Sequence, residues 1–266
     1  MNFGICLIAV APLRREPNHQ SEMVNQVLFG ECMQIIGHQK DWYQVETLED
    51  QYPGWIHKVQ LTILTAEGFE KIVKDKRHVS KAAFSVATEE RTGQPADQNK
   101  KQNLIISGGS SIYAGDDGSM CVAGKKFCFS DELICMEIKN RDAIPEFAKS
   151  FLSIPYIWGG RSAYGFDCSG FVQLVFKMAG FLIPRDAAAQ ANAGEQVHLL
   201  QESVPGDLVF FDNEEEIITH VGILLNNKLV IHAYGKVRID HIDHQGIYNR
   251  EQKKYSHHLR LIKRIA

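Results

Sequence analysis

Residues 165–180 read GFDCSGFVQLVFKMAG, with a cysteine between an aspartate and a serine and a long apolar run directly after it. The apolar side chains from Phe171 to Met178 form a wide face at helical spacing, and Gly180 follows as a C-terminal cap. Asp167 suits the N-cap position, where a carboxylate accepts hydrogen bonds from first-turn amides. The segment therefore predicts a helix that begins at Cys168.

Cys168 is a candidate nucleophile because of this position. The positive end of the helix dipole and the unpaired first-turn amides favour a negative charge there. We therefore expect a lowered thiol pKa and a thiolate able to attack a substrate. The remaining five cysteines lie in strand-like segments, form no C-x-x-C pair and are expected to be free and structural: Cys6, Cys32, Cys121, Cys128 and Cys135.

Two of the eleven histidines lie in strongly apolar strand segments, His220 in ITHVGILL and His232 in LVIHAYG. If both face the same side of one hairpin, His220 can act as the general base for Cys168 and His232 can orient it. The histidines near the C-terminus are expected to be solvated: His241, His244, His257 and His258.

The hairpin register decides whether the two histidines meet. A two-residue loop at Asn226 and Asn227 puts them on opposite faces of the sheet. A three-residue loop over residues 226–228 puts them on one face at diagonal positions, about 7–8 Å apart between backbones. We predict the odd-length loop, with a bulge near Lys228 and with Gly222 opposite His232.

Outward from this region the chain divides by pattern. Residues 1–65 read as short strands broken by Gly, Asp and Pro, which indicates a small barrel. Residues 66–140 combine a polar stretch at 87–103, expected to be a loop or linker, with strands of a second small barrel. Residues 141–266 contain helices followed by strands, which predicts an α+β domain.

Composition excludes several classes of function. The 266 residues carry a formal net charge of -3 without a basic block, so neither nucleic acid nor an anionic membrane is an expected partner. The first apolar run lacks the features of an export signal, and no apolar stretch reaches membrane-spanning length. The cysteine usage fits a reducing compartment, so we expect a cytoplasmic protein. No metal or cofactor is expected, because no ligand spacing matches.

Six motifs occur in order over about residues 141–260: PYIWGG, DCSGFVQLVF, IPRDAAAQ, VPGDLVFF, THVGI and IHA. Together they resemble the NlpC-type cell-wall cysteine peptidases. The N-terminal segments VAPLRREPNHQSEMVNQVLFGE, DWYQVET and YPGWIH resemble bacterial SH3-like domains. They accompany one branch of that family, the γ-D-glutamyl-L-diamino-acid endopeptidases. The resemblance implies a papain-like α+β catalytic domain preceded by one or two small all-β SH3-like barrels.

By this resemblance the reaction is hydrolysis of the γ-D-glutamyl–diamino acid bond in cell-wall stem peptides with a free N-terminal L-Ala, as in muropeptide recycling. It implies a triad of Cys168, His220 and His232. The Cys168 amide and the Tyr156 hydroxyl would stabilise the oxyanion. The leaving amine would take a proton from His220.

The resemblance also implies a set of substrate-binding residues. Arg185 and Asp186 are expected near the D-Glu carboxylate and the substrate amine, and Ala187 replaces a serine common in that branch. In the first barrel, two residues match positions that bind the free amino terminus. The substrate-binding residues are thus Asp167, Ser169, Arg185, Asp186, Trp158, Glu16 and Tyr52.

Two other classes of function stay open at this point. The same fold hosts papain-like acyltransferases and amidases that use the same triad logic on other substrates. A catalytically silent peptide-binding module is the other alternative, because SH3-like repeats bind peptides. Intact cysteine and histidine positions favour the hydrolase.

Overall fold

The structure is a computed structural model that describes residues 2–91, 101–249 and 253–265. The chain forms two compact units, Met1–Glu137 and Ile138–Ala266, close to the boundary that the sequence pattern suggests. Nowhere in the described ranges is a helix both long and apolar enough to span a membrane.

The first barrel of the N-terminal unit is a seven-stranded antiparallel sheet in the order β3-β2-β6-β5-β4-β1-β7. It wraps around a buried core that includes Leu13, Val27, Val45 and Ile56. Its elements are β1 (Asn2–Ile5), β2 (Val10–Arg14), β3 (Met23–Leu28), β4 (Cys32–Gln39), β5 (Trp42–Thr47), β6 (Pro53–His57), the 3-10 helix η1 (Lys58–Gln60) and β7 (Thr62–Leu64).

The second β-domain of this unit has two small sheets, β10-β9-β13-β12 and β11-β8-β14. Its core is continuous with Ile5, Phe29 and Leu64 of the first barrel, so the two β-domains pack as one body. Its elements are α1 (Ala66–Val73), β8 (Lys76–Ser80), β9 (Phe84–Arg91), β10 (Gln102–Ser107), β11 (Ser111–Ala114), β12 (Met120–Val122), β13 (Lys125–Phe129) and β14 (Leu133–Cys135).

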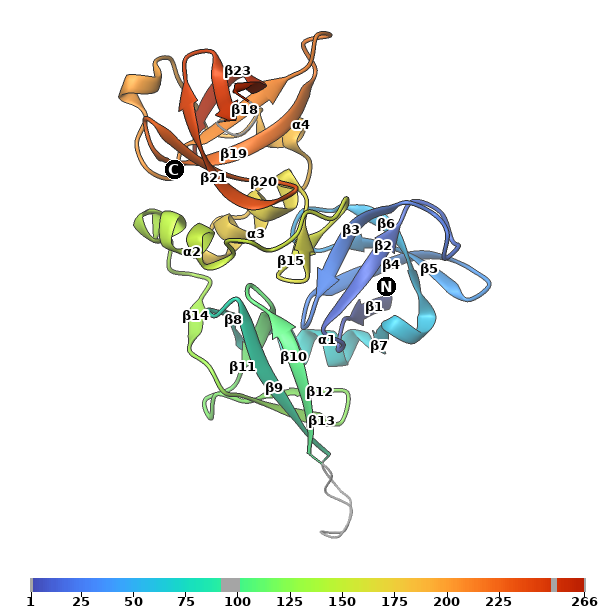
Figure 1. The fold of residues 1–266 in the computed structure, drawn as a ribbon. Helices are drawn as coiled ribbons and strands as arrows, with labels where there is room; N and C mark the ends of the chain where they lie inside the picture. Colours follow the sequence, from blue (N-terminus) through green and yellow to red (C-terminus); the bar gives the residue numbers. More distant parts are fainter. Residues whose placement is uncertain (1, 92–100, 250–252, 266) are drawn as a thin grey trace. The chain divides into compact units, whose positions relative to one another are not determined.

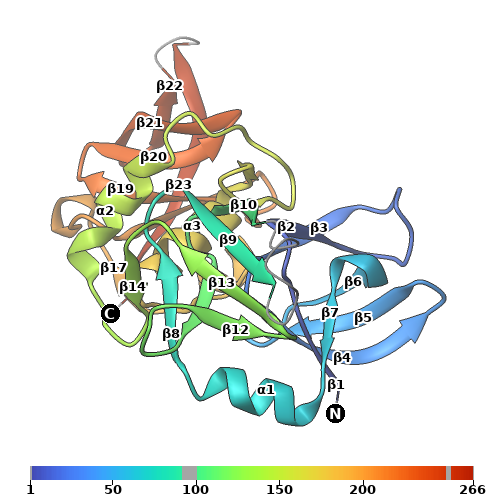
Figure 2. The same ribbon diagram turned by 90° about the horizontal axis from the view of Figure 1, so that it is seen from below.

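Two features of this region differ from expectation. Helix α1, beside β7 and β12 in Figure 2, starts at the side-chain cap of Thr65 and stacks Phe69 on Phe3 at 3.9 Å. The polar stretch at 87–103 is not simply a loop, because β9 and β10 extend into it. The end of β9 lacks the alternation of apolar and polar residues that would predict a strand. An ion pair of 3.1 Å between Glu89 and Lys125 joins it to β13 instead. Residues 92–100 of that stretch lie outside the described residues.

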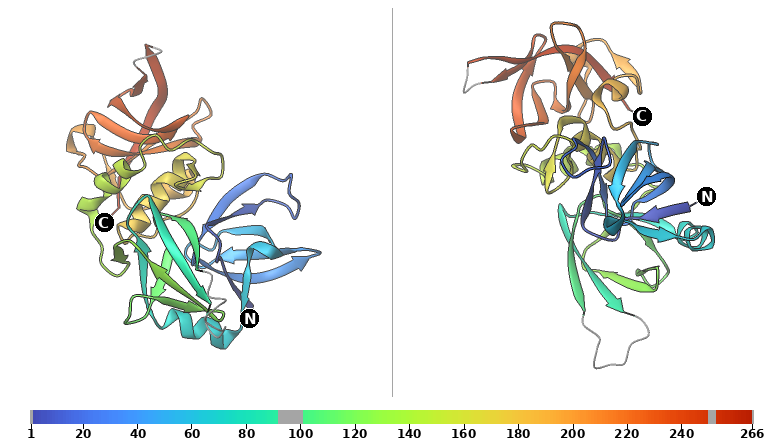
Figure 3. Two further views of the ribbon diagram at one scale, coloured as in Figure 1. Left: turned by 60° about the horizontal axis from the view of Figure 1, so that its bottom comes forward. Right: turned by 90° about the vertical axis from the view of Figure 1, so that its right-hand side faces the viewer.

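The C-terminal unit is α+β, as predicted: helices are followed by a seven-stranded sheet in the order β17-β23-β18-β19-β20-β21-β22, in which β22 also pairs with β23. Figure 3 shows α3 lying against this sheet, which it contacts through β19 and β20. Its helical elements are η3 (Arg141–Ala143), α2 (Ile144–Ser150), α3 (Cys168–Met178), α4 (Ala187–Gln190) and η4 (Leu200–Glu202). Its strands are β15 (Arg161–Ser162), β16 (Gly165–Phe166), β17 (Glu195–Val197), β18 (Leu208–Asp212), β19 (Ile218–Asn226), β20 (Leu229–Tyr234), β21 (Lys236–Asp243), β22 (Gly246–Asn249) and β23 (Lys254–Arg264).

The β19–β20 hairpin has the predicted register but not the predicted loop. Ile223 pairs with Ile231, which is the register that puts the two site histidines on one face. The turn itself is tight, because Asn226 pairs with Leu229 and its side chain accepts a hydrogen bond from the Lys228 amide at 2.8 Å. The extra residue is taken up by a bulge within β19, between residues 224 and 226, rather than near Lys228.

Candidate active site

Helix α3 begins at Cys168, as the sequence predicts. The Asp167 carboxylate caps it by accepting a hydrogen bond from the Gly170 amide at 2.7 Å. Almost the whole helix is buried, so its first turn is held by packing as well as by the cap. This arrangement presents the thiol at the end of the helix where backbone N–H groups are unpaired.

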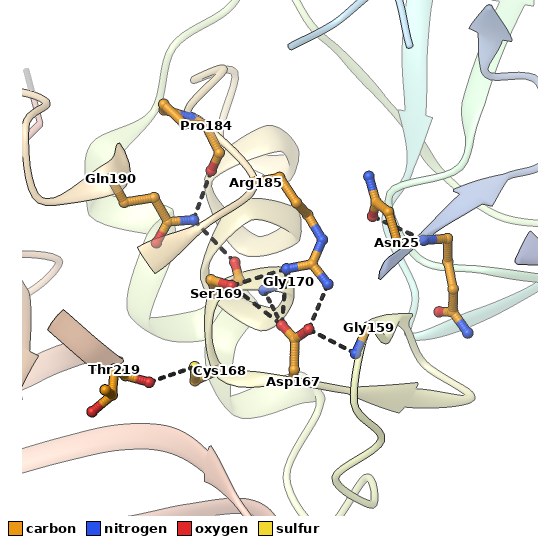
Figure 4. Close-up of polar contacts among 11 residues, drawn as sticks. Asn25, Gly159, Asp167, Cys168, Ser169, Gly170, Pro184, Arg185, Gln190 and Thr219 are labelled. Atoms are coloured by element: carbon orange, nitrogen blue, oxygen red, sulfur yellow. Dashed lines mark hydrogen bonds and ion pairs between the residues drawn. The ribbon is translucent and has the colours of Figure 1, made fainter. Parts of the chain in front are cut away.

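A cluster of polar groups surrounds Asp167 behind the thiol (Figure 4). Arg185 donates two hydrogen bonds to the two carboxylate oxygens of Asp167, at 3.0 and 2.5 Å. The amide of Gly159 donates to the same carboxylate at 3.0 Å, and Arg185 also donates to the Ser169 hydroxyl at 2.9 Å. The carboxylate thus joins the helix, the preceding loop and the segment before α4 into one rigid unit.

Close backbone approach explains the glycines in this region. A Cβ atom on Gly170 would collide with the carbonyl oxygen of Gly160 and lie 3.0 Å from Oδ1 of Asp167. Gly160 in turn has no room for a side chain, because its Cβ would meet the backbone carbonyl of Gly165. The helix can therefore lie against β15 and β16 only with glycine at these positions.

The sulfur of Cys168 lies beside β19, where it contacts the carbonyl oxygen of Thr219 at 3.9 Å. Burial raises the pKa of the Cys168 thiol to about 11, and the Asp167 charge adds to the rise. Backbone N–H groups of Val221 and Ser169 act in the opposite direction but are outweighed. The expected lowered pKa is therefore wrong for the resting site: the nucleophile is a neutral thiol that must lose its proton during attack.

The two predicted histidines meet directly. Nε2 of His220 and Nδ1 of His232 are 2.8 Å apart, and both rings are buried. His220 lies between Thr219 and Val221, the two residues whose backbones flank the Cys168 sulfur. The fold therefore places the Cys168 thiol against the strand segment that carries His220, and His220 against His232 through its Nε2 atom, which leaves Nδ1 as its other ring nitrogen.

Burial is the main cause that lowers the pKa of both rings. The pKa of His220 lies well below its ordinary value, with the His232 and His257 charges lowering it further. For His232, hydrogen bonding to Asp240 opposes the fall without reversing it. Both imidazoles are therefore neutral at pH 7, which suits a base that accepts the thiol proton during attack.

Asp240 and Arg238 extend this chain of contacts, and the sequence reasoning did not identify either. Nε2 of His232 lies 2.9 Å from Oδ2 of Asp240. Arg238 donates to both oxygens of that carboxylate, at 2.6 and 2.8 Å. The feature that could have identified them is the register of β20 and β21, which pairs His232 with Arg238 across a tight turn at Gly235.

His257 is a further member of the site, and its predicted solvation is wrong. Its ring stacks on that of His220, with centroids 4.2 Å apart and planes 26° from parallel. Burial, followed by the charge of His232, lowers the pKa of His257 to about 4. His257 belongs to β23, which reaches His220 through β18, so only the sheet order reveals the contact. Of the other three C-terminal histidines, His244 and His258 are exposed and His241 is half-buried.

Tyr156 and Trp158 lie in the loop before β15. The backbone of Tyr156 bridges to Phe166 and donates to the carbonyl of Gly235 at 3.0 Å, so it joins the helix side to the sheet side. Burial raises the pKa of Tyr156 to about 12, and the nearby Cys168 adds to the rise, so its hydroxyl stays a hydrogen-bond donor. Trp158 is 63% exposed and offers an aromatic face to solvent.

Arg185 and Asp186, the two residues expected near the substrate's carboxylate and amine, differ in their surroundings. The guanidinium of Arg185 is buried and already bound to Asp167 and Ser169. Asp186 is exposed at the N-terminal end of α4, and Ala187 is the first residue of that short helix. Of this pair of charged residues, only Asp186 presents its side chain to solvent.

The two first-barrel residues lie at one end of that barrel. Glu16 follows β2 and is exposed, with its amide donating to the Ser21 hydroxyl at 2.9 Å. Tyr52 is half-buried and directly precedes β6. The antiparallel pairing of Arg14 with Trp55 brings the two residues to the same end.

Comparison with known proteins gives concordant matches. The model of the NlpC/P60 family matches residues 153–257, and that of the bacterial dipeptidyl-peptidase SH3 domain matches residues 13–61. The chain is similar to the γ-D-glutamyl-L-lysine dipeptidyl-peptidase of Bacillus subtilis, at 33% identity over 223 residues, covering 78% of this chain and 71% of that protein. It is also similar to dipeptidyl-peptidase 6 of Lysinibacillus sphaericus, at 26% identity over 91% of this chain and 92% of that protein.

A solved structure has the same fold. The crystal structure of an NlpC/P60 family protein from Bacillus cereus superposes with a TM-score of 0.80 at 21% identity. The match covers 98% of this chain and 99% of that one, so the same folds follow one another along both chains.

Proposed function

Because the chain belongs to the NlpC/P60 family of cysteine peptidases, we propose that it hydrolyses the γ-D-glutamyl–diamino acid bond of cell-wall stem peptides that begin with a free L-Ala. The observation that carries the catalytic part is the 2.8 Å contact between His220 and His232 beside the Cys168 thiol. The names of the dipeptidyl-peptidase relatives support the substrate class.

The proposed mechanism starts from a neutral thiol and a neutral imidazole. As the Cys168 sulfur attacks the γ-carbonyl carbon of D-Glu, Nδ1 of His220 takes the thiol proton. The Cys168 amide and the Tyr156 hydroxyl donate to the oxyanion. His220 then protonates the leaving amine of the diamino acid, and a thioester remains on Cys168.

Deacylation reuses the same base. His220 takes a proton from water, and the resulting hydroxide attacks the thioester carbonyl. The thiolate leaves and regains its proton from His220, which releases L-Ala-γ-D-Glu. In this scheme Asp167 and Arg185 keep the helix terminus rigid, so their contribution is orientation.

The proposal assigns recognition of the substrate's free amine to the first barrel and to acidic side chains. In the first barrel, Glu16 is an exposed carboxylate that can pair with an ammonium group, and Tyr52 can add a hydrogen bond. In the other unit, Asp186 is an exposed carboxylate of the same kind. Trp158 and Ser169 would contact the peptide near the thiol. A substrate without the charged amine could not form these contacts, which disfavours acetylated or glycan-linked stems.

We propose that the enzyme works in the cytoplasm on small muropeptides taken up for recycling. The six cysteines are all free thiols, which supports a reducing compartment.

The decisive test is cleavage of defined peptides. L-Ala-γ-D-Glu-meso-diaminopimelate and its L-Lys counterpart are incubated with the full chain and with Cys168→Ala, and products are followed by mass spectrometry. Release of L-Ala-γ-D-Glu by the unmodified chain alone supports the proposal. If only transfer to an added amine occurs, the protein is an acyltransferase; if neither peptide reacts while Cys168 stays reactive, the substrate class is wrong.

N-acetylated versions of both peptides test amine recognition separately. We expect cleavage of the acetylated peptides to fall by about tenfold or more, because the ion pair between the substrate's ammonium group and the carboxylate is lost. Glu16→Gln should reduce that discrimination, and Glu22→Gln is a control from the same barrel. Equal cleavage of free and acetylated peptides would remove the role proposed for Glu16.

A further inference from the structure

We infer that Asp240 is a positioning residue that sets the proton arrangement of both site histidines, with Arg238 holding its carboxylate. The inference rests on the pairing of Cys168 with His220 in the proposed function, but not on the identity of the substrate. It adds an anionic member behind a triad of Cys168, His220 and His232.

The geometry is a continuous chain of short contacts. Nε2 of His220 meets Nδ1 of His232 at 2.8 Å, and Nε2 of His232 meets Oδ2 of Asp240 at 2.9 Å. Arg238 binds both oxygens of Asp240 through Nε and Nη2. Because two parallel hydrogen bonds fix the plane of a carboxylate, Oδ2 is aimed at the histidine ring.

The sheet register makes this arrangement rigid. β20 and β21 pair His232 with Arg238 and Val230 with Asp240, so the interacting side chains share one face of the sheet. A left-handed glycine, Gly235 at φ +69°, closes the turn between the strands. The His232 side chain is fully buried, so its ring depends on neighbouring protein groups for hydrogen bonds.

Proton assignment follows from the donor and acceptor capacity of each group. Hydrogen bonds from His232 and Arg238 outweigh burial and hold the pKa of Asp240 at about 2, so the carboxylate is ionised and can only accept. His232 must then carry its proton on Nε2, which leaves a lone pair on Nδ1.

The assignment passes to the catalytic ring in the same way. The lone pair on Nδ1 of His232 accepts the Nε2 proton of His220. In a neutral His220, the remaining lone pair is then on Nδ1, where it can take the proton of Cys168. The opposite tautomer of His232 would aim its Nε2 lone pair at the carboxylate, so Asp240 disfavours it.

Removing the carboxylate should therefore cost turnover rather than binding. Without Asp240, His232 can carry its proton on either nitrogen, and only part of the population keeps a basic Nδ1 on His220. We expect Asp240→Ala to lower kcat by roughly 10- to 100-fold with KM changed less than about twofold, by analogy with the hydrogen-bond partners that orient metal-bound histidines.

The closing experiment reads the protons directly, without a peptide substrate. Full-length chain with 15N-labelled histidine is compared by NMR at pH 7.5 for the unmodified protein, Asp240→Asn and Asp240→Ala, together with the rate of Cys168 alkylation by iodoacetamide. We expect Nε2 protonation on both rings in the unmodified protein. In Asp240→Ala we expect a mixture of tautomers and about tenfold slower alkylation. Asp240→Asn should be intermediate, because its amide oxygen can still accept.

Asp243→Ala is the matched control, since it removes a carboxylate from the same strand. Asp243 accepts a hydrogen bond from Tyr255 at 2.6 Å and from nearby backbone amides. Its variant should keep the tautomers and the alkylation rate. A proton on Nδ1 of His220 in the unmodified protein overturns the inference, as does an unchanged folded Asp240→Ala. Failure to cleave stem peptides would affect only the proposed substrate, because neither readout uses one.

Discussion

The two sides of the active site use the same pair of residue types in different ways. On the helix side, Asp167 bound by Arg185 lies behind Cys168. On the sheet side, Asp240 bound by Arg238 lies behind His232. The first aspartate is the neighbour of its reactive residue in sequence, whereas the second lies one strand away.

The two carboxylates act in the same electrostatic direction but with different consequences. Beside the burial that raises the pKa of the thiol, the charge of Asp167 raises it further and so works against a resting thiolate. Asp240 opposes the fall that burial causes in the pKa of His232, and its hydrogen bond favours a proton on the nitrogen of His232 that faces it. The helix side therefore holds the nucleophile in position, and the sheet side determines which nitrogen of His220 accepts the thiol proton. The following predictions test this division, beginning with the largest expected effect.

Loss of the nucleophile should abolish turnover without unfolding the chain. We expect Cys168→Ala to lower kcat by at least about a thousandfold, because no second nucleophile can form the thioester. Circular dichroism and thermal unfolding should stay close to those of the unmodified protein. Cys121→Ala is the control, since that thiol is exposed in the other unit. Retained peptidase activity in Cys168→Ala would refute covalent catalysis by this residue.

The two histidines should differ in importance. His220→Ala removes the proton acceptor and should lower kcat roughly 10³- to 10⁴-fold, whereas His232→Ala removes only its orientation and should cost roughly 10- to 100-fold. Steady-state kinetics on one peptide at saturating concentration measures both. Equal losses would mean that His232 takes part in the proton transfer itself.

Removing each aspartate should separate the two sides by stability. Asp167→Ala leaves the buried Arg185, with 1% of its side chain exposed, without its main partner, and should cost about 3–5 kcal/mol of unfolding free energy. Asp240→Ala removes one partner of Arg238, whose side chain is 21% exposed, and the acceptor of the buried His232 N–H, and should cost about 1–3 kcal/mol. Urea unfolding followed by tryptophan fluorescence gives both values. A larger loss of unfolding free energy in Asp240→Ala than in Asp167→Ala would contradict the different roles assigned to the two sides.

The pH profile tests the sheet side alone. Burial lowers the pKa of His220, His232 and His257 below the ordinary value of 6.5. The unfolded chain therefore binds more protons below pH 6.5, so stability falls as the pH drops from 6.5 toward the folded-state values and levels off below them. For the same reason kcat/KM should stay flat through pH 6.5 and fall only below it.

Rates and melting temperatures between pH 8 and 4.5 check this profile. The exposed His244→Gln should leave it unchanged. An acid limb of kcat/KM centred at or above pH 6.5 would contradict a buried neutral base.

The smallest expected effect comes from His257. Loss of the ring that stacks on His220 should lower kcat about 2- to 10-fold in His257→Ala, the range expected for one aromatic pair. His257→Phe keeps a flat ring and should recover most of the loss. If both variants behave alike, stacking does not position the base.

Sequence patterns predict the helix side well because its geometry is local. Asp167 and Cys168 are consecutive, and an N-cap followed by an apolar face specifies the start of a helix within a few residues. The shared face of His220 and His232 is also predictable, because alternation along a hairpin depends only on register.

The rest of the sheet side depends on which strands become neighbours. Asp240 and His257 reach the site through β21 and β23, and nothing in their own segments indicates those neighbours. The resting charge of Cys168 also escaped prediction, because burial is a property of the folded domain. Helix α1 could have been predicted, because Thr65 is an N-cap and Ala66, Phe69 and Val73 follow it at helical spacing.

The tight approach of Gly170 to Gly160 bears on how related sequences should be sorted into active and inactive ones. A chain that keeps Cys168, His220 and His232 but has a larger residue at position 170 must move the carbonyl of Gly160 or the carboxylate of Asp167. Such a chain would be expected to have lost its activity although every reacting group is present. A glycine at position 170 is therefore as useful as the nucleophile for judging whether a distant homologue is active.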